Sequence, residues 1–234
     1  MLEVKDLDFH YKEGEPIFSG AHLEISPCTF SIIIGPNGGG KTTLLNLLMG
    51  FLEPTHGTIA SNFQQIGYVP QSNKIDLEFP IRLIDHVLIG CIQKLTWWGG
   101  FSHSTHQFVD DLLKRLDLFH LKDLRLKELS GGQLQRAQIA HALACQPDLL
   151  ILDEPTSNID PKAKGEILKI LHDLKRQMAI VMVTHDLETL LPETDQVLLV
   201  SNGIEKVDKA NLCRHTYMGL YETKLTSLGE KKDV

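Results

Sequence analysis

The chain has 234 residues, of which 42% are hydrophobic and 23% charged, and its 23 basic and 30 acidic residues give a net charge of −7. This composition is typical of a soluble globular protein, and the acidic balance argues against the basic surface that nucleic-acid binding needs. No apolar run reaches the roughly 18 residues that cross a bilayer, and the first residues do not form a signal sequence, so we expect a chain that neither spans a membrane nor is secreted. The cysteines are too far apart for a C-x-x-C site and are expected to be free thiols in a reducing cytosol.

Residues 2–11 alternate apolar and polar side chains, as an antiparallel strand does. A turn at residues 13–16 separates this segment from a partner strand at residues 23–26. Tyr11 has two interpretations, a half-buried aromatic at a strand end or a ring on which adenine stacks. The local pattern favours the first.

An apolar run at residues 30–34 leads through a glycine-rich loop into a helix-like stretch at residues 44–49. The loop matches G-x-x-x-x-G-K-[ST] in the strand–loop–helix context that supports a phosphate-binding loop. It consists of Gly35, Pro36, Asn37, Gly38, Gly39, Gly40, Lys41, Thr42 and Thr43. Glycines let backbone N–H groups approach a triphosphate closely, and the following helix points its N-terminus at the same anion. We expect Lys41 to bind the β- and γ-phosphates and the Thr42 hydroxyl to bind Mg²⁺.

Two short strands are expected at residues 58–60 and 66–69, and Gln71 follows the second. A side-chain amide placed there can reach both a metal ion and a water, although a lone glutamine in a loop is usually only solvated. From residue 72 to 145 the apolar residues recur at helical spacing, for example at positions 108, 112, 116 and 119. This pattern predicts an inserted helical subdomain, whose first helix follows Pro80. For Trp97 and Trp98, packing of a loop onto these helices is favoured over an exposed aromatic contact for a partner.

Ser130 and Gln133 have the spacing of a capping box and begin a helix that runs to about residue 144. Gly131 and Gly132 in its first turn each cost about 1 kcal/mol relative to alanine. A bare, positively polarised helix end is suited to docking an anion, which gives that cost a functional explanation.

The apolar run at residues 149–152 predicts a central parallel strand that ends in Asp153 and Glu154. Ligands bind at the carboxyl ends of such strands, where one carboxylate can hold hydrated Mg²⁺ while the other orients or deprotonates a water. Asp160 then begins an amphipathic helix. A second buried strand at residues 179–184 ends at His185, which could donate a hydrogen bond to a terminal phosphate, although ordinary packing is favoured for an isolated histidine. Residues 197–207 are predicted to form a hairpin, and the tail after residue 221 is polar.

Taken in order, these elements resemble the nucleotide-binding subunit of ABC transporters over nearly the whole chain. The resembling motifs are Walker A at residues 35–43, the Q-loop at Gln71, the signature at residues 129–133, Walker B at residues 149–154, the D-loop at residues 157–160 and the switch histidine at His185. The resemblance implies an α/β fold with a P-loop NTPase core of mostly parallel sheet, an N-terminal antiparallel β-subdomain and an inserted α-helical subdomain. Within one ABC ATPase domain, the core and the β-subdomain would span residues 1–71 and 146–220, the helical subdomain residues 72–145, and the polar tail residues 221–234.

The resemblance also implies roles for the site residues with ATP and Mg²⁺ as cofactors. Tyr11 would stack on adenine, and Lys41 and the loop amides would hold the phosphates. The expected metal ligands are Thr42, Gln71 and, through water, Asp153; the expected catalytic groups are Glu154 as base, His185 on the γ-phosphate, and Gln71. Further nucleotide contacts would come from Ser130, Gly131, Gly132, Gln133 and Asp160. Because family members close head to tail around two nucleotides, the signature residues would act on the ATP of the other copy.

The resemblance implies a homodimer that forms when ATP binds and dissociates when ATP is hydrolysed. The helical subdomain would transmit this motion to integral membrane permease subunits. The protein would lie in the cytoplasm, attached to the membrane through the permease, and would work only indirectly with an extracytoplasmic substrate-binding protein. Residues 66–71, 79–80 and 85–90 resemble subunits of manganese, zinc and iron uptake systems, which we favour over import of ferric siderophore, haem or cobalamin. An ABC-type ATPase that acts on nucleic acid or ribosomes without a permease is the alternative of another class.

Four residues depart from the family pattern. Gly39 replaces the commoner Ala or Ser, Thr42 replaces the commoner Ser, and Cys28 stands where a turn glycine is frequent. Asn158 stands where a small residue is usual and bears on the dimer contact of the D-loop. None of the four is a catalytic group.

Overall fold

The computed structural model describes residues 1–209 except 13–14, 72–76, 158, 187–191 and 193. The predicted turn at residues 13–16 is therefore described only in part, and Asn158, Cys213 and the polar tail lie outside the described residues. Within the described chain, no helix has the length and apolar character needed to cross a bilayer. The chain divides into two compact units: one is built from Met1–Ile25, Phe30–Ser61 and the residues from Val183 onward, the other from Ser26–Thr29 and Asn62–Met182.

The first unit contains an antiparallel sheet in which β1 (Leu2–Phe9) lies between β2 (Phe18–Ile25) and β4 (His56–Ser61). Val4 of β1 stands opposite Leu23 on one side and Ile59 on the other. From Ala21 onward alternate residues of β2 are buried, as expected where one face of a sheet covers the core. The predicted N-terminal antiparallel region is therefore confirmed, and β2 begins five residues earlier than predicted.

The first unit also contains the strand that leads into the phosphate loop. This strand, β3 (Phe30–Ile34), pairs in parallel with β8 (Gln196–Val200). The chain then turns back, and β9 (Ile204–Val207) pairs antiparallel with β8, which confirms the predicted hairpin. Every residue of β3 is buried, as expected for a strand inside a parallel sheet. Helix α1 (Lys41–Leu48) begins three residues before the predicted helical stretch.

The sheet of the second unit carries the predicted carboxylates. β5 (Ile66–Val69) pairs in parallel with β6 (Leu149–Asp153), whose other neighbour is β7 (Ala179–Val183). All residues of β6 and β7 are buried, which confirms the two apolar runs as core strands. Helix α5 (Pro161–Lys175) connects β6 to the neighbouring strand β7.

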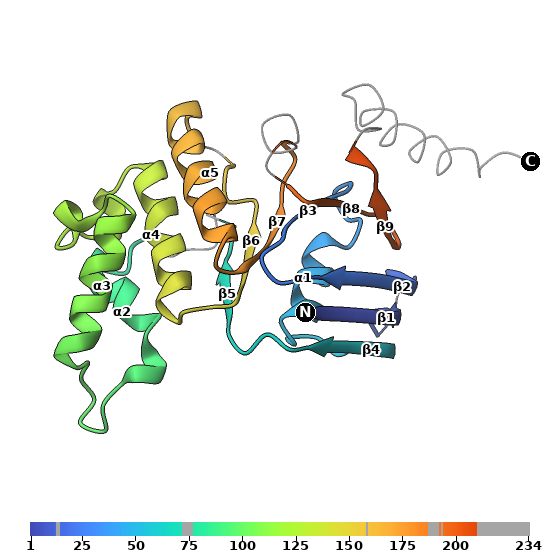
Figure 1. The fold of residues 1–234 in the computed structure, drawn as a ribbon, viewed down its shortest axis with the longest axis horizontal. Helices are drawn as coiled ribbons and strands as arrows, with labels where there is room; N and C mark the ends of the chain where they lie inside the picture. The colour runs from blue at the N-terminus through green and yellow to red at the C-terminus, as the bar shows by residue number, and fades with distance from the viewer. Residues whose placement is uncertain (13–14, 72–76, 158, 187–191, 193, 210–234) are drawn as a thin grey trace, which may run out of the picture. The chain divides into compact units, whose positions relative to one another are not determined.

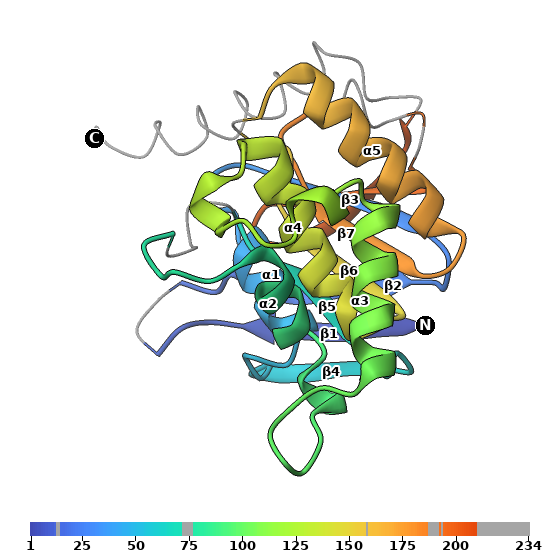
Figure 2. The ribbon, with the colours of Figure 1, turned by 90° about the vertical axis from the view of Figure 1, so that its left-hand side faces the viewer.

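The helical part of the second unit comprises α2 (Leu83–Ile89), α3 (His103–Arg115) and α4 (Gly131–Ala144), with short 3-10 turns at Ile92–Lys94, Phe119–Leu121 and Leu126–Glu128. Figures 1 and 2 show α2, α3 and α4 side by side. The predicted spacing through residue 119 runs past the end of α3, because Asp117 takes a left-handed conformation (φ 54°) that ends the helix. The preferred interpretation of Trp97 and Trp98 was wrong, since both side chains are exposed and do not pack onto the helices.

Candidate functional site

The phosphate loop of the first unit joins the end of β3 to the start of α1. Gly38 and Gly40 have positive φ angles of 79° and 98°, which glycine adopts without steric cost. Gly40 is the N-cap of α1 and offers no side-chain cap. The N–H groups of the first turn therefore lack a side-chain acceptor, and a helix end in this condition attracts an anion.

Two glycines of this loop pack against β8, and the position of Gly35 leaves no room for a side chain. A Cβ atom at Gly39 would lie 2.9 Å from the carbonyl oxygen of Val200 and 3.0 Å from that of Pro36, and a Cβ at Gly35 would collide with the same Val200 oxygen. Backbone oxygens cannot move aside as a flexible side chain can. Val200 thus shapes the phosphate loop, although no local sequence signal pointed to it, because the pairing of β3 with β8 brings it there.

Lys41 lies inside the loop that it ends. Its side chain is 8% exposed, and Nζ donates hydrogen bonds to the carbonyl oxygens of Gly35 (2.8 Å) and Pro36 (2.9 Å). The ammonium charge is therefore held at the place where the sequence predicts phosphate. The neighbouring Thr42 is exposed, so its hydroxyl is accessible to a ligand.

Tyr11 follows β1 and reaches the phosphate loop. Its ring packs edge-on against Phe9 at a centroid distance of 5.1 Å, and its hydroxyl lies 3.3 Å from Oγ1 of Thr43. Half of the residue is nevertheless exposed, at 50%. The ring is thus both a strand-end aromatic and a free surface beside the phosphate loop, and both predicted interpretations remain compatible with its position.

His185 comes directly after Thr184, whose backbone N–H donates to the carbonyl oxygen of Ile33 at 3.2 Å. Ile33 is one residue from the end of β3. The histidine therefore leaves its strand at the same sheet edge as the phosphate loop, as predicted, and it is exposed.

The second unit brings Gln71 and Glu154 together. Nε2 of Gln71 donates a hydrogen bond to Oε2 of Glu154 at 3.0 Å. Because β5 and β6 are paired in parallel, the residues that follow them emerge at one edge. The glutamine, a weak signal in the sequence, is thus in contact with the carboxylate predicted to be the base.

Asp153 and Glu154 are separated by the turn of the backbone. Asp153 is the last residue of β6 and is only 5% exposed. Glu154 has a left-handed conformation (φ 51°), and its carbonyl oxygen accepts hydrogen bonds from the N–H and hydroxyl of Ser157. Burial, with a smaller contribution from the Asp153 carboxylate, raises the pKa of Tyr68, which places negative charge close to that ring. The left-handed turn directs two successive carboxylates to different surroundings, as a division of roles requires.

The predicted capping box of the signature helix is present. Oγ of Ser130 accepts from the Gln133 N–H at 3.3 Å, and Oε1 of Gln133 accepts from the Ser130 N–H at 2.9 Å. A Cβ at Gly132 would collide with the Cβ of Ala163 in α5, so this glycine also serves the packing of α4 on α5. The Ser130 side chain is exposed and accessible to an anion.

Asp160 caps α5. Its Oδ1 accepts from the N–H groups of Lys162 (3.1 Å) and Ala163 (3.0 Å). This structural role accounts for the carboxylate, and the predicted nucleotide contact of Asp160 stays a prediction.

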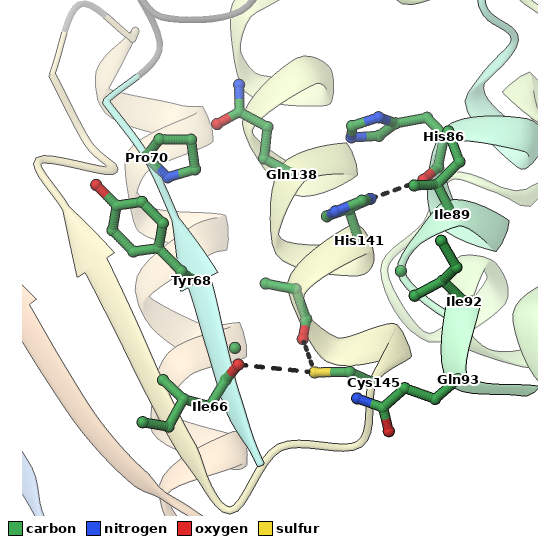
Figure 3. A pocket seen from close by; sticks show the side chains of 13 residues that line it. Ile66, Tyr68, Pro70, His86, Ile89, Ile92, Gln93, Gln138, His141 and Cys145 are labelled. Atoms are coloured by element: carbon green, nitrogen blue, oxygen red, sulfur yellow. Dashed lines mark hydrogen bonds between the residues drawn. The ribbon is translucent and has the colours of Figure 1, made fainter. Parts of the chain in front are cut away.

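A cavity of about 490 Å³ in the second unit was not predicted (Figure 3). It is lined by residues of β5, α2, α4 and the segment after α2, among them Tyr68, Pro70, His86, Gln138, His141 and Cys145. The rings of His86 and His141 stack with centroids 4.5 Å apart, and Nδ1 of His141 lies 2.7 Å from the His86 carbonyl oxygen, so it donates. Burial and the neighbouring His141 lower the pKa of His86 to about 4. Sequence analysis missed these residues because they meet only when α2 packs on α4.

Unsatisfied polar groups line this cavity. Gln138 is 3% exposed, and within the described part of the chain neither atom of its amide has a hydrogen-bond partner. The same holds for Nε2 of His86. Buried polar groups without partners cost stability, so this wall is suited to receiving a partner that supplies them.

The model of the ABC transporter family matches residues 18–157. The chain is 42% identical over 193 residues to a "Probable metal transport system ATP-binding protein" of Chlamydia muridarum, covering 80% of this chain and 82% of that protein. It is 33% identical over 207 residues to the zinc import ATP-binding protein ZnuC of Pasteurella multocida, covering 87% and 74%.

Among solved structures, the chain is similar to a protein described as a metal-chelate type ABC transporter in an inward-facing conformation. The TM-score is 0.85 at 29% identity, over 94% of this chain and 88% of that one. These similarities confirm the predicted α/β fold with its P-loop NTPase core, antiparallel sheet and helical insertion. The chain belongs to the ABC transporter family, as one of its ATP-binding subunits that hydrolyse ATP.

Proposed function

We propose that this subunit hydrolyses Mg²⁺-bound ATP to drive an importer for a divalent metal ion, manganese, zinc or iron. The hydrogen bond between Gln71 and Glu154 is the observation that carries the ATPase mechanism, because it joins the expected metal ligand to the expected base. The metal cargo is supported by the names of two similar proteins, which transport metal or import zinc.

The phosphate loop fits a triphosphate. The uncapped start of α1 supplies N–H groups, and Lys41 supplies a buried charge that is now bonded to Gly35 and Pro36. We expect Lys41 Nζ to exchange these carbonyl oxygens for phosphate oxygens, since hydrogen bonds between ionised groups are the stronger ones. Tyr11, beside the loop, would cover the adenine ring.

The ligand set fits Mg²⁺, which prefers oxygen ligands and keeps several waters. Thr42, Gln71 and, through water, Asp153 would hold it, and the metal would neutralise charge on the phosphates. Glu154 would take the proton of the attacking water, with the Gln71 amide fixing the orientation of its carboxylate. His185 would donate to the γ-phosphate.

A second copy of the chain would complete the site. The exposed Ser130 and the N–H groups of Gly131 and Gly132 would bind the γ-phosphate held by the other copy, with Gln133 and Asp160 nearby. A nucleotide shared in this way joins the two copies, and loss of its γ-phosphate releases them.

We infer that the permease contacts the cavity between β5, α2 and α4. Pro70 lines the cavity and Gln71 is the next residue, so a permease segment seated there would move the group that orients Glu154. A helix end or polar side chain of the permease would also satisfy the buried amide of Gln138. The subunit would then lie at the cytoplasmic face of the membrane, with a substrate-binding protein on the far side. In this arrangement residues 72–145 act as the moving helical subdomain on a core formed by residues 1–71 and 146–220.

Uptake of radiolabelled zinc, manganese and iron by cells with and without this subunit tests the cargo. We expect uptake of one ion to be lost on deletion, restored by the wild-type chain, and not restored by Glu154→Gln. Loss of ferric siderophore, haem or cobalamin uptake instead would reject the metal-ion assignment and keep the importer.

A pull-down from detergent-solubilised membranes tests the class of machine. Recovery of a polytopic permease is expected. Recovery of ribosomes or DNA in its place would reject transport altogether.

A further inference from the structure

The segment between α2 and α3 projects from the helices of the second unit as a narrow loop (Figure 2). Leu95 and Phe101 form an antiparallel bridge at its base, and we call residues 95–101 the Trp hairpin. Trp97 and Trp98 stand at its tip and are 85% and 83% exposed, more than any other large hydrophobic side chain that the structure describes. Exposure of two adjacent indoles marks an interaction surface.

The hairpin is an ordered element. The Thr96 N–H donates to the Gly100 carbonyl oxygen at 2.8 Å, the Gly99 N–H donates to the Thr96 carbonyl oxygen at 2.9 Å, and the Thr96 hydroxyl also donates to the Gly100 oxygen at 2.8 Å. Gly99 takes the positive φ of 81° that the turn needs. The indoles touch each other, with centroids 4.6 Å apart, and among the described residues neither N–H has a hydrogen-bond partner. The tip is thus held in an exposed conformation, so binding would cost little further ordering.

The apolar surface continues from the tip toward the cavity. Ile89, Ile92 and Leu95 are 48%, 64% and 45% exposed, although isoleucine and leucine are usually buried. Ile89 and Ile92 also line the cavity that we assign to the permease. A surface continuous with that contact lies close to the membrane if the permease occupies the cavity.

The charge pattern around the hairpin is unlike that of the rest of the chain. No acidic residue occurs among the 24 residues between Asp85 and Asp110, whereas 30 of the 234 residues are acidic. At that average, about one residue in eight, a stretch of this length would carry three acidic residues. Its one fully charged side chain is the cationic Lys94, whose ammonium lies 4.5 Å over the ring of Phe108 and donates to Gln146. The hairpin and the residues on either side of it therefore carry no carboxylate that an anionic layer would repel.

We propose that the Trp hairpin inserts its two indoles into the headgroup region of an anionic lipid membrane. Indoles concentrate at that depth because the ring is apolar while its N–H can donate to lipid carbonyl and phosphate oxygens. The unpaired N–H groups, the flanking apolar side chains and the absence of carboxylates all match such a layer. A contact of this size is weak alone, and it becomes effective in a subunit that a permease already holds at the membrane, by raising its local concentration there.

The isolated subunit tests this proposal without permease, ATP or metal. Trp97 and Trp98 are the two tryptophans of the chain, so intrinsic tryptophan fluorescence reports on the hairpin alone. We expect vesicles of phosphatidylglycerol and phosphatidylethanolamine to shift the emission to the blue, and lipids brominated on the acyl chain to quench it. Emission that stays unchanged in excess vesicles, or that shifts only when membrane proteins are present in them, would overturn the proposal.

Flotation with the same vesicles gives the second measurement. The double variant Trp97→Ala and Trp98→Ala should lose most of the bound fraction, whereas Phe51→Ala, which removes another exposed aromatic (70%), should keep it. His103→Glu adds a carboxylate at the first residue of α3, where negative charge favours the helix, and should weaken binding about fivefold, the equivalent of about 1 kcal/mol per charge near the surface. Equal flotation of the double variant and the wild type would refute the lipid contact. Failure of the metal-uptake experiment would not affect this result, because the vesicles contain no transporter.

Discussion

The phosphate loop of the first unit and the Gln71–Glu154 pair of the second each hold a reactive group in internal hydrogen bonds, but by different means. Lys41 is buried and bonded to two backbone carbonyl oxygens of its own loop. Glu154 is half-buried, and its carboxylate accepts from the side-chain amide of Gln71 beyond the end of another strand. The loop therefore holds Lys41 through its own backbone, whereas the orientation of Glu154 depends on a side chain from another segment of the chain.

The starts of α1 and α4 also differ, in how the N–H groups of the first turn are satisfied. Helix α1 has a glycine N-cap and no side-chain cap, so a ligand must satisfy its first turn. Helix α4 has a capping box formed by Ser130 and Gln133, which satisfies the N–H groups of these two residues without a ligand. We therefore expect the phosphate loop of the first unit to act mainly in nucleotide binding and the Gln71–Glu154 pair of the second unit to act in hydrolysis.

The largest effect is expected from Glu154→Gln. Loss of a general base should lower the rate of ATP hydrolysis by a factor of about 10² to 10⁴ and leave ATP binding intact, because the amide keeps the shape of the side chain. Steady-state hydrolysis and titration with a fluorescent nucleotide measure the two quantities, and gel filtration should reveal a trapped nucleotide-bound dimer. Asp111→Asn, at an exposed carboxylate, is the matched control. Undiminished hydrolysis would remove Glu154 from its assigned role.

Lys41→Met should mainly weaken ATP binding, whereas Glu154→Gln mainly lowers the rate of hydrolysis. Hydrogen bonds to a charged group contribute about 1.5 to 3 kcal/mol, so ATP affinity should fall about 10- to 100-fold. Calorimetric titration measures this change, and Lys114→Met, at an exposed lysine, should leave affinity unchanged. Wild-type affinity in Lys41→Met would contradict the assignment of binding to the first unit.

Acid should destabilise the second unit through His86. Its pKa is lowered from 6.5 to about 4, so the unfolded chain takes up a proton that the folded chain does not as the pH falls through 6.5. The stability from this group is present above pH 6.5 and should decrease by about 2 kcal/mol between pH 7.5 and pH 5. Hydrogen exchange should show faster opening of α2 and α4, with β1 and β2 unaffected, and His86→Phe should flatten this dependence. The same pH dependence in His86→Phe as in the wild type would assign the effect to another group.

Gln71→Leu tests whether the Glu154 carboxylate depends on the hydrogen bond from the Gln71 amide. Removal of one hydrogen bond to a charged group should slow hydrolysis by about tenfold, at nearly constant affinity for ATP measured without Mg²⁺, because Gln71 is also an expected metal ligand. Gln64→Leu, at an exposed glutamine of the same unit, should change neither. A loss of affinity without a loss of rate would break the proposed division of roles.

Ser130→Ala should have the smallest effect on stability. The loss of an N-cap costs about 1 kcal/mol, or about 2 to 4 °C in Tm for a chain of this size. Ser102 caps α3 in the same way, so Ser102→Ala should show a similar loss. Hydrolysis that depends on paired copies should fall only in Ser130→Ala, and equal hydrolysis in both variants would deny Ser130 a nucleotide contact.

Sequence analysis predicted the features that depend on local pattern. The buried strands, the phosphate loop and the capping box at Ser130 follow from periodicity and from residue types at fixed spacing, and the structure confirms them. The bond between Gln71 and Glu154 did not follow from either segment, because it needs the parallel pairing of β5 with β6. Trp97 and Trp98 were interpreted wrongly because burial is the ordinary state of a large aromatic, and the turn that exposes them depends on hydrogen bonds between Thr96 and Gly100.

The contact of Gly35 with the Val200 carbonyl oxygen has a consequence for how this protein diverges over time. A chain that had lost the ability to bind nucleotide would still need this glycine, because its own β8 strand leaves no room for a Cβ atom there. Retention of Gly35 in a lineage therefore shows that the fold has been kept, and it says nothing about whether the chain still hydrolyses ATP. The packing of the backbone does not require the ammonium group of Lys41, so this residue can be substituted once ATP binding is lost. Its presence or absence in related chains therefore distinguishes subunits that bind ATP from those that no longer do.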